Sequence, residues 1–375
     1  MKKTYIIYSA LIFIMLAVPG LLLMVLPQRE YSANENRYLD KLPEINASKI
    51  ISGEFQEEVS NAFNDQFFIR DFMAGLSTSF KQALGFKDIG GVYIAKDKYY
   101  IEKITDNDIS KNQLIKNLMY LSYFTEKQQA DVYTMFVPSP GTILSSRLPA
   151  FAPFYNADTI YNTASTILGT QEILDLRKVL TPGSNGSRDL YFKTDHHWTL
   201  PGAYAAYKEY CTVAGLKVQP YNSFNPEKAS RNFYGTLYSK APGFTTEPDD
   251  IYVVQTSLTE NAEVICDGKK QTGIYNKEYL DKKDKYSCFF GGNYGRTDIK
   301  TGSNANRKLL VLKDSFANSF VPFLLNDYSH ITMIDARYYN KSLLDIASSE
   351  NYNHILILYE ASNFANDKNL YKFIK

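Results

Sequence analysis

The stretch RKLLVLKDSFANSFVPFLL, residues 307–325, decides the fold class. Its apolar run 309–312 is typical of a buried strand, and a helical spacing of apolar residues begins directly after Asp314 and Ser315. Ser315 is therefore expected on a strand-to-helix turn. Backbone N–H groups and the positive end of the helix dipole at such a turn can hold the oxyanion that forms when a serine attacks an acyl carbon. The alternative is that Asp314 or Ser315 merely caps the helix.

Short apolar runs of the same kind recur along the chain, at 131–139, 172–177, 330–335 and 354–360. Stretches with helical periodicity, such as 107–129, lie between them. Near-continuous apolar strands separated by helices predict an α/β fold with a mostly parallel sheet flanked by helices. Functional residues in such sheets lie beyond the carboxyl ends of the strands.

Composition narrows the classes of function. The chain has 375 residues, and its 41 Lys+Arg nearly balance its 40 Asp+Glu, so wholesale binding of nucleic acid is not expected. The 30 tyrosines suit stacking on sugar rings, but tyrosine is equally common in cores and interfaces. No phosphate-cradling glycine-rich loop occurs in the sequence, and neither a nucleotide nor any other cofactor is expected.

Residues 5–26 form a charge-free run of 22 residues, the length that crosses a bilayer as a helix. A secretory signal peptide is usually shorter and ends in a small-residue cleavage site, so an uncleaved anchor is favoured. The expected organisation is a membrane anchor at 1–28, a juxtamembrane segment at 29–104 and an α/β domain at 105–375. The juxtamembrane segment should include a hairpin at 91–104. The α/β domain should lie outside the cytoplasm and carry an insertion of irregular or β structure at about 218–305.

Three cysteines follow this run: Cys211, Cys266 and Cys288. An exterior location permits a Cys266–Cys288 disulfide, with Cys211 buried. The alternative is that all three are reduced and buried.

A base for Ser315 is supplied by YFKTDHHWT, residues 191–199. In an extended segment Asp195 and His197 point to the same side. Asp195 could then orient the His197 ring, while the free ring nitrogen takes the proton of Ser315. The helix that follows is expected to begin at Thr199. Two alternatives are a metal site built from Asp195 and the histidines, which diverging neighbouring side chains disfavour, and a purely structural histidine.

These two stretches resemble the DHHW proteins, which are related to the alginate O-acetylation proteins with an SGNH-hydrolase-like domain. TDHHWT (194–199) resembles the family signature, and VLKDSFANSF (311–320) resembles the block that carries its serine. SANENRYLDKLPEI (32–45), FNDQFFIRD (63–71) and FYGTLYSKAPG (233–243) resemble further blocks in the same order. The resemblance covers nearly the whole chain after the anchor.

The resemblance implies an SGNH-hydrolase-like fold in which Ser315 is the nucleophile, His197 the base and Asp195 its orienting residue. SGNH hydrolases have glycine where this chain has Lys313, so the resemblance does not assign the residues of the oxyanion hole. Candidates for the oxyanion or substrate contacts are three other residues: Asn318, Asn363 and Trp198.

The function expected from the resemblance is O-acetyl transfer to a cell-surface or exported polysaccharide, without a metal or cofactor. A membrane-bound O-acyltransferase is the implied source of acetyl groups. An acetylesterase with the same residues, or a non-catalytic polysaccharide-binding subunit, is the alternative.

Overall fold

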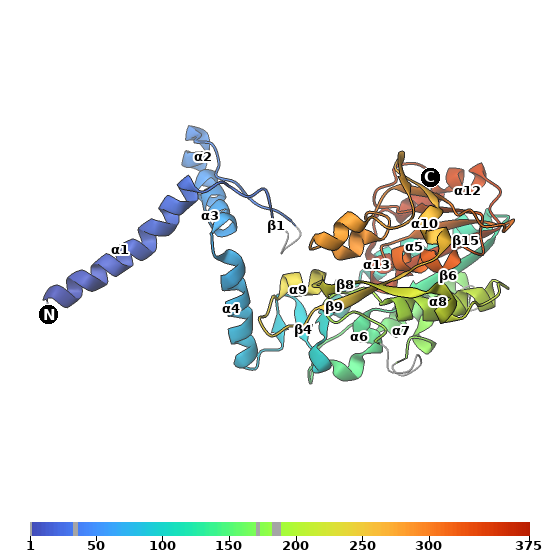
Figure 1. The fold of residues 1–375 in the computed structure, drawn as a ribbon, viewed down its shortest axis with the longest axis horizontal. Helices are drawn as coiled ribbons and strands as arrows, with labels where there is room; N and C mark the ends of the chain where they lie inside the picture. Colours follow the sequence, from blue (N-terminus) through green and yellow to red (C-terminus); the bar gives the residue numbers. More distant parts are fainter. Residues whose placement is uncertain (1, 33–36, 170–172, 182–188) are drawn as a thin grey trace. The chain divides into compact units, whose positions relative to one another are not determined.

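A computed structural model describes residues 2–32, 37–169, 173–181 and 189–375. The chain forms two compact units (Figure 1). The first contains Met1–Ile89 and Tyr238–Thr246, and the second contains Gly90–Leu237 and Glu247–Lys375.

The first unit begins with helix α1 (Lys2–Val25). Its segment Thr4–Val25, with a mean hydropathy of 2.5, is the single stretch in the described residues that is long and apolar enough to cross a membrane. A signal sequence near the N-terminus has the same properties, so the helix is compatible with either role.

The rest of the first unit is mainly helical. It contains β1 (Tyr31–Ser32), β2 (Arg37–Tyr38), α2 (Ala47–Ser52), α3 (Glu54–Gln66), α4 (Arg70–Ala83) and β3 (Asp88–Ile89). The distant segment 238–246 joins it because the backbone N–H of Phe244 donates to Ser79 Oγ on α4, and the Phe244 ring packs on Phe72.

An eight-stranded sheet forms the centre of the second unit, in the order β11-β10-β12-β14-β13-β15-β6-β7. Its strands are β6 (Asp131–Val137), β7 (Ile173–Asp175), β10 (Glu263–Cys266), β11 (Lys269–Thr272), β12 (Arg296–Lys300), β13 (Lys308–Lys313), β14 (His330–Ile334) and β15 (His354–Glu360). The five neighbouring strands from β14 to β7 are parallel to one another, which confirms the predicted α/β class. Glu172, the first residue of the strand predicted at 172–177, lies outside the described residues.

The segment 218–305 was expected to form an insertion of irregular or β structure. Part of it, β10–β12, extends the main sheet with antiparallel strands, which the sequence pattern did not reveal. Another part, β8 (Pro226–Phe233) and β9 (Asp249–Val254), forms a separate antiparallel ribbon. The predicted hairpin at 91–104 is confirmed by the pairing of β4 (Val92–Ile94) with β5 (Tyr100–Glu102).

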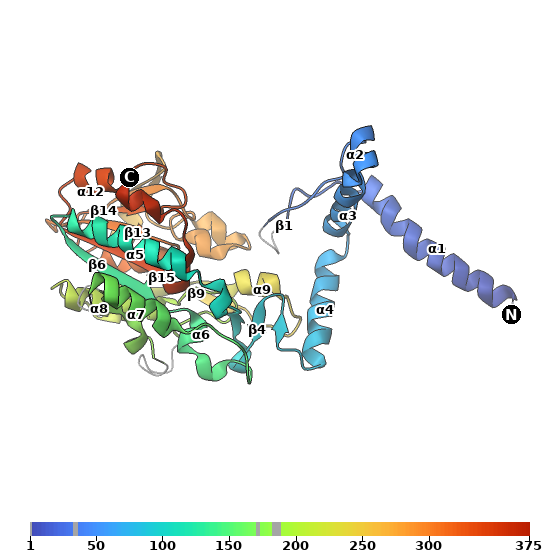
Figure 2. The same cartoon turned by 180° about the vertical axis from the view of Figure 1, so that it is seen from behind.

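Successive side chains of the central strands point to opposite faces of the sheet, and both faces are buried. Leu309 and Val311 of β13 join one apolar cluster, while Leu310 and Leu312 join the other. The first face is covered by α8 (Leu200–Val213) and α11 (Ala317–Phe320), which continues as a 3-10 turn. The second face is covered by α5 (Lys111–Glu126), α7 (Ala157–Leu168) and α12 (Leu343–Ser349), which are labelled in Figure 2, and by α13 (Ala361–Asn366).

Shorter helices are α6 (Pro140–Ile143), α9 (Thr236–Lys240) and α10 (Ser257–Asn261). The helix start expected at Thr199 is confirmed, and Ser110 caps α5 in the same way. Ser110 Oγ accepts the N–H of Gln113 at the start of α5, and Thr199 Oγ1 accepts the N–H of Gly202 at the start of α8. All three cysteines are buried free thiols, which agrees with the second of the two alternatives for them.

Candidate active site

Ser315 lies at the C-terminal edge of the parallel sheet, two residues after β13 and just before α11. It is partly exposed, whereas its neighbours Asp314 and Phe316 are buried. Asp314 Oδ1 accepts the N–H of Phe316 and so fixes the turn. The Ser315 hydroxyl is bound elsewhere, so this serine does not serve as a side-chain cap.

The segment 191–199 reaches Ser315 as a closed loop in front of α8. Tyr191 and Trp198 form an antiparallel bridge, and the N–H of Phe192 donates to the carbonyl of His197. The expected extended segment is therefore replaced by a tight loop. Asp195 and His197 still meet because the Asp195 carboxylate turns back onto both the backbone and the ring of His197.

Hydrogen bonds join Asp195, His197 and Ser315 in a row. His197 Nδ1 lies 2.6 Å from Asp195 Oδ1, and His197 Nε2 lies 2.7 Å from Ser315 Oγ. Because the carboxylate accepts at Nδ1, that nitrogen carries the proton and Nε2 is left as the acceptor for the serine O–H. The structure thus brings together the three residues that the sequence had proposed as one group.

Asp195 is held from its other side by the block 233–236. Its Oδ2 accepts the backbone N–H of Thr236 at 2.8 Å and the Thr236 hydroxyl at 3.0 Å. Gly235 packs directly against it: a Cβ at that position would lie 2.3 Å from Asp195 Cβ. The segment FYGT (233–236), which belongs to one of the blocks that resemble the family, therefore holds the Asp195 carboxylate in place.

Burial and neighbouring charge set the protonation states. Burial alone would raise the pKa of Asp195, but His196, His197 and the hydrogen bonds hold it well below its usual value. Burial lowers the pKa of His197 to about 4, because it outweighs the attraction of Asp195. An ionised carboxylate next to a neutral imidazole is the pairing that a general base requires.

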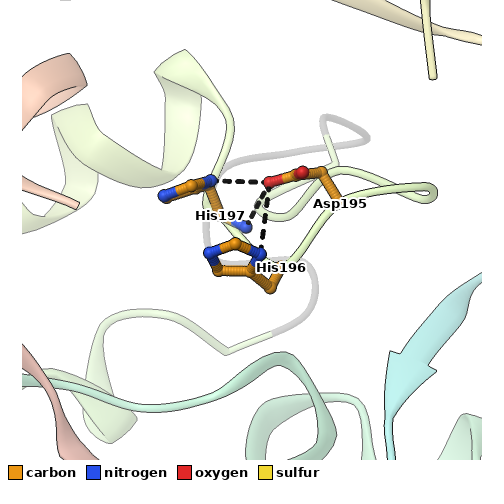
Figure 3. A group of neighbouring side chains, drawn as sticks. All are labelled: Asp195, His196 and His197. Carbon is orange, nitrogen blue, oxygen red and sulfur yellow. Dashed lines mark hydrogen bonds and ion pairs between the residues drawn. The ribbon is translucent and has the colours of Figure 1, made fainter. Parts of the chain in front are cut away.

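The metal alternative can be tested against the geometry. The expectation that neighbouring side chains diverge is wrong here, since ligand atoms of Asp195, His196 and His197 all lie within 4.8 Å of one another (Figure 3). Both ring nitrogens of His197 are, however, engaged by Asp195 and Ser315, and His196 Nδ1 lies 2.8 Å from Thr236 Oγ1. A metal would have to displace these bonds, so the arrangement does not fit a preformed metal site.

The three residues proposed for oxyanion or substrate contacts are all engaged elsewhere. Trp198 is fully buried, and its indole N–H donates to Ser319 Oγ and the carbonyl of Phe316, which suits packing beneath the turn. Asn363 is exposed and donates to Asp314 Oδ2 at 3.0 Å. Asn318 is buried, accepts from Lys313 and donates to Asn293.

Tyr286 was not predicted from the sequence. Its ring stacks on the His197 ring with centroids 3.9 Å apart and planes 11° from parallel. Its hydroxyl donates to the carbonyl of Ser315 and lies 3.0 Å from Ser319 Oγ. Tyr286 belongs to the irregular insertion, where one tyrosine among many gave no signal.

Two protein-family models match parts of this chain. Residues 183–334 match the sequence model of the DHHW protein family, and residues 99–240 match that of the AlgX acetyltransferase SGNH hydrolase-like domain. The resemblance to the DHHW family is confirmed.

Solved structures share the fold. A DHHW family protein from Eubacterium siraeum superposes with a TM-score of 0.64 at 23% identity, covering 76% of this chain and 95% of the other. PatB1 from Bacillus cereus superposes with a TM-score of 0.62 at 23% identity, covering 74% and 97%. A comparison with curated proteins finds no match. The second unit of this DHHW-like chain thus has the expected SGNH-like α/β fold.

Gly235→Ala is predicted to disable the site, because the new methyl group must push Asp195 away from His197. The rate at which a fluorophosphonate labels Ser315, followed by mass spectrometry, should fall about 100-fold, as for other small displacements of reacting groups. Gly75→Ala, which creates a similar clash with Phe244 in the first unit, is the control and should leave the rate unchanged. An unaltered labelling rate in folded Gly235→Ala would contradict this assignment.

Two substitutions of Tyr286 should distinguish the contribution of its ring from that of its hydroxyl. Tyr286→Phe keeps the stack and should slow labelling only by about fivefold, the worth of a hydrogen bond. Tyr286→Leu removes the stack and lets water reach His197, so the pKa of His197 should rise toward its ordinary value. The labelling rate, which falls at low pH as His197 becomes protonated, should then begin to fall at a higher pH. If the labelling rates of the Tyr286→Leu and Tyr286→Phe variants depend on pH in the same way, the ring does not lower the pKa of His197.

Proposed function

We propose that the second unit is an O-acetyltransferase that acts on a cell-surface or exported polysaccharide through Ser315, His197 and Asp195. The single observation that carries the proposal is the 2.7 Å contact between Ser315 Oγ and the Nε2 of a buried, carboxylate-bound His197. A serine in this setting can be deprotonated as it attacks.

The chemistry follows from the positions of these atoms. Ser315 Oγ attacks the acetyl carbon of a donor, its proton moves to His197 Nε2, and the donor's leaving group departs with that proton. An acetyl ester on Ser315 results. The same nitrogen then takes the proton of a sugar hydroxyl, whose oxygen attacks the ester carbon. The bond between that carbon and Ser315 Oγ breaks, the sugar keeps the acetyl group, and the proton passes from His197 Nε2 to Ser315 Oγ. Asp195 stabilises the imidazolium that forms in both steps.

Relatedness supports the acetyl chemistry at the level of the family. The AlgX-type domain that residues 99–240 match is described as an acetyltransferase, and one PatB1 structure carries a sulfonyl adduct. Sulfonylating reagents react with activated nucleophiles, so the same class of reagent is a suitable probe for Ser315. No metal or cofactor is required for the proposed steps.

An acetylesterase is the second candidate, since water can replace the sugar hydroxyl at the acetyl-serine. A non-catalytic polysaccharide-binding subunit is a third candidate, although it would need neither the ordered histidine nor the contact with Ser315. We favour transfer because the family match points to acetyltransferases.

Incubation of the full chain in detergent with a chromogenic acetyl ester, with and without polysaccharide, tests the proposal. Ser315→Ala and His197→Ala should each lose about 1000-fold or more of the acetyl release. His330→Ala, at the start of β14, is the matched control. Acetyl release that needs Ser315 but never reaches the polysaccharide would favour an esterase. Release that persists in Ser315→Ala would remove the serine mechanism.

We further infer that α1 is an uncleaved anchor, that the second unit lies outside the cytoplasm, and that a membrane-bound O-acyltransferase supplies acetyl groups. The apolar segment Thr4–Val25 supports the anchor. A donor enzyme in the same membrane would be placed within reach by such an anchor.

The anchor predicts that the full chain stays in the membrane fraction after extraction with alkaline carbonate. A chain that starts at residue 28 should be released, since the remaining sequence contains no second run of comparable length. Detection of a mature protein that lacks α1 would show a signal peptide instead.

A further inference from the structure

Helix α4 (Figure 1) carries its large apolar side chains on its outer face. The residues that are buried on this helix are small, namely Gly75 and Thr78. Helices of soluble domains have the reverse arrangement, with the large apolar side chains turned toward the core. The exposed residues recur at spacings of three and four and so form one row, here called the apolar stripe: Ile69, Phe72, Met73, Leu76, Phe80 and Leu84.

The segment that packs on α4 leaves the apolar stripe uncovered. The ring of Phe244 lies against Gly75, where a Cβ would be 2.6 Å from Phe244 Cε1, and so it covers the face with the small residues. Phe244 also contacts Phe72, yet both rings stay more than half exposed. Phe244 therefore extends the exposed apolar surface. Surfaces of this kind mark a contact with a membrane or with another protein.

Packing within the first unit sets the level at which α4 begins. Leu22 and Leu26, at the end of the apolar run of α1, face Phe67 and Phe68 at the junction of α3 and α4, with a cavity of only about 10 Å³ between them. The apolar run of α1 has the length of the hydrocarbon layer, so a spanning α1 ends at the surface of that layer. The start of α4 is then held at the same surface.

Hydrogen bonds fix the same junction on the polar side. Arg29 is the first charged residue after the apolar run. Its backbone N–H donates to Gln66 Oε1 at 2.8 Å, and Gln66 Nε2 donates to the carbonyl of Arg29 at 2.9 Å. The Arg29 guanidinium also lies 3.7 Å from Asp71 Oδ2 in the first turn of α4. The end of α1 and the start of α4 are therefore tied together by side chains as well as by the chain.

The far end of α4 shows which way the helix runs. A helix of 14 residues is about 21 Å long, so an α4 that led away from the bilayer would expose its last turn to water. The apolar stripe nevertheless continues to Leu84, and Phe86 beyond the helix is also exposed. The segment from Phe72 to Lys87 contains no acidic residue, and its cations, Lys81 and Lys87, are exposed. This composition suits lipid phosphates beside an apolar layer along the whole helix.

We propose that α4 is an in-plane membrane helix, whose apolar stripe lies in the lipid–water interface of a phospholipid bilayer beside the point where α1 leaves it. This inference rests on the anchor role proposed for α1. The stripe should lie about 5–10 Å deep, at the boundary between headgroups and acyl chains. Such binding is reversible, unlike a membrane span, and it gives the first unit a second attachment to the same surface.

The single tryptophan of the chain makes the depth of α4 measurable. Trp198 is fully buried, so lipid quenchers cannot reach it, and an added tryptophan reports its own surroundings. The full chain is reconstituted into vesicles of phosphatidylcholine and phosphatidylglycerol that carry bromine either near the headgroup end or near the tail end of the acyl chains. Phe80→Trp should be quenched more strongly by the shallow bromines, at a depth of about 5–10 Å.

Two further variants give the comparison. Phe13→Trp, in the middle of α1, should be quenched more strongly by the deep bromines, because a spanning helix places it near the centre of the bilayer. Lys81→Trp is the matched control on α4. It lies one residue beyond Phe80 and about 100° around the helix, so it should be quenched less. If Phe80→Trp fails to fold, as shown by its melting curve, Leu76→Trp replaces it one turn earlier in the stripe.

The outcomes separate this inference from the anchor. Quenching of Phe13→Trp without quenching of Phe80→Trp would overturn the inference and leave the anchor standing. Shallow quenching of Phe80→Trp in a chain whose Phe13→Trp is not quenched would support the in-plane helix while the spanning anchor fails. Equal quenching of Phe80→Trp and Lys81→Trp would overturn the proposed orientation. A blue-shifted but unquenched Phe80→Trp would show that protein, either a second copy or the second unit, covers the stripe instead of lipid.

Discussion

The pairing of β13 between β14 and β15 is the constraint on which the site depends. Both neighbours are parallel to β13, so the three strands deliver their carboxyl ends to one edge of the sheet. Ser315, Asp335 and Glu360 follow or end these strands. Leu310 and Leu312 face one buried layer while Leu309 and Val311 face the other, so the register cannot slip by one residue without turning apolar side chains into the wrong layer. The position of Ser315 is thereby determined by the core.

The second half of the site is held by its own hydrogen bonds. Asp195 accepts from His197 through both the backbone and the ring, and from Thr236 through both the backbone and the hydroxyl. A carboxylate with its acceptor sites filled in this way stays ionised although it is buried. The start of the loop is also held by Asp249, whose carboxylate accepts hydrogen bonds from the backbone N–H groups of Lys193 and Thr194. Little rearrangement is therefore needed before His197 can take a proton, which is the sense in which such a site is preorganised.

The sequence revealed what depends on local pattern and missed what depends on distant contacts. Alternation of apolar strands with helices predicted the parallel sheet, and the two-residue spacing of Asp195 and His197 predicted their contact. The predicted contact is present, but the extended backbone assumed for it is wrong, because the loop around the two residues is bent. The antiparallel strands β10–β12 were missed because their alternation is short and lies among polar residues.

Tyr286 could not be found from the sequence for the same reason. Its contacts join positions 286, 197, 315 and 319, and nothing near it in the chain specifies that it must stack on an imidazole. Trp198 shows the opposite case. Its place in the signature suggested a substrate contact, whereas its complete burial and its bond to Ser319 give it a packing role. A distinctive residue in a motif can thus be one that holds the motif together.

The lysine at the glycine position shows how a departure from a family pattern can be informative. A glycine there leaves space and supplies no charge, whereas Lys313 brings a cation into a buried position next to the site. Burial of that cation is costly unless each of its donors is matched by an oxygen. Asn293, Asn318 and Asp335 provide this match, and they come from three different segments of the chain. The requirement to satisfy one buried ammonium therefore links the insertion, the helix after Ser315 and the neighbouring strand, so residues that share no local motif are fixed around the same serine.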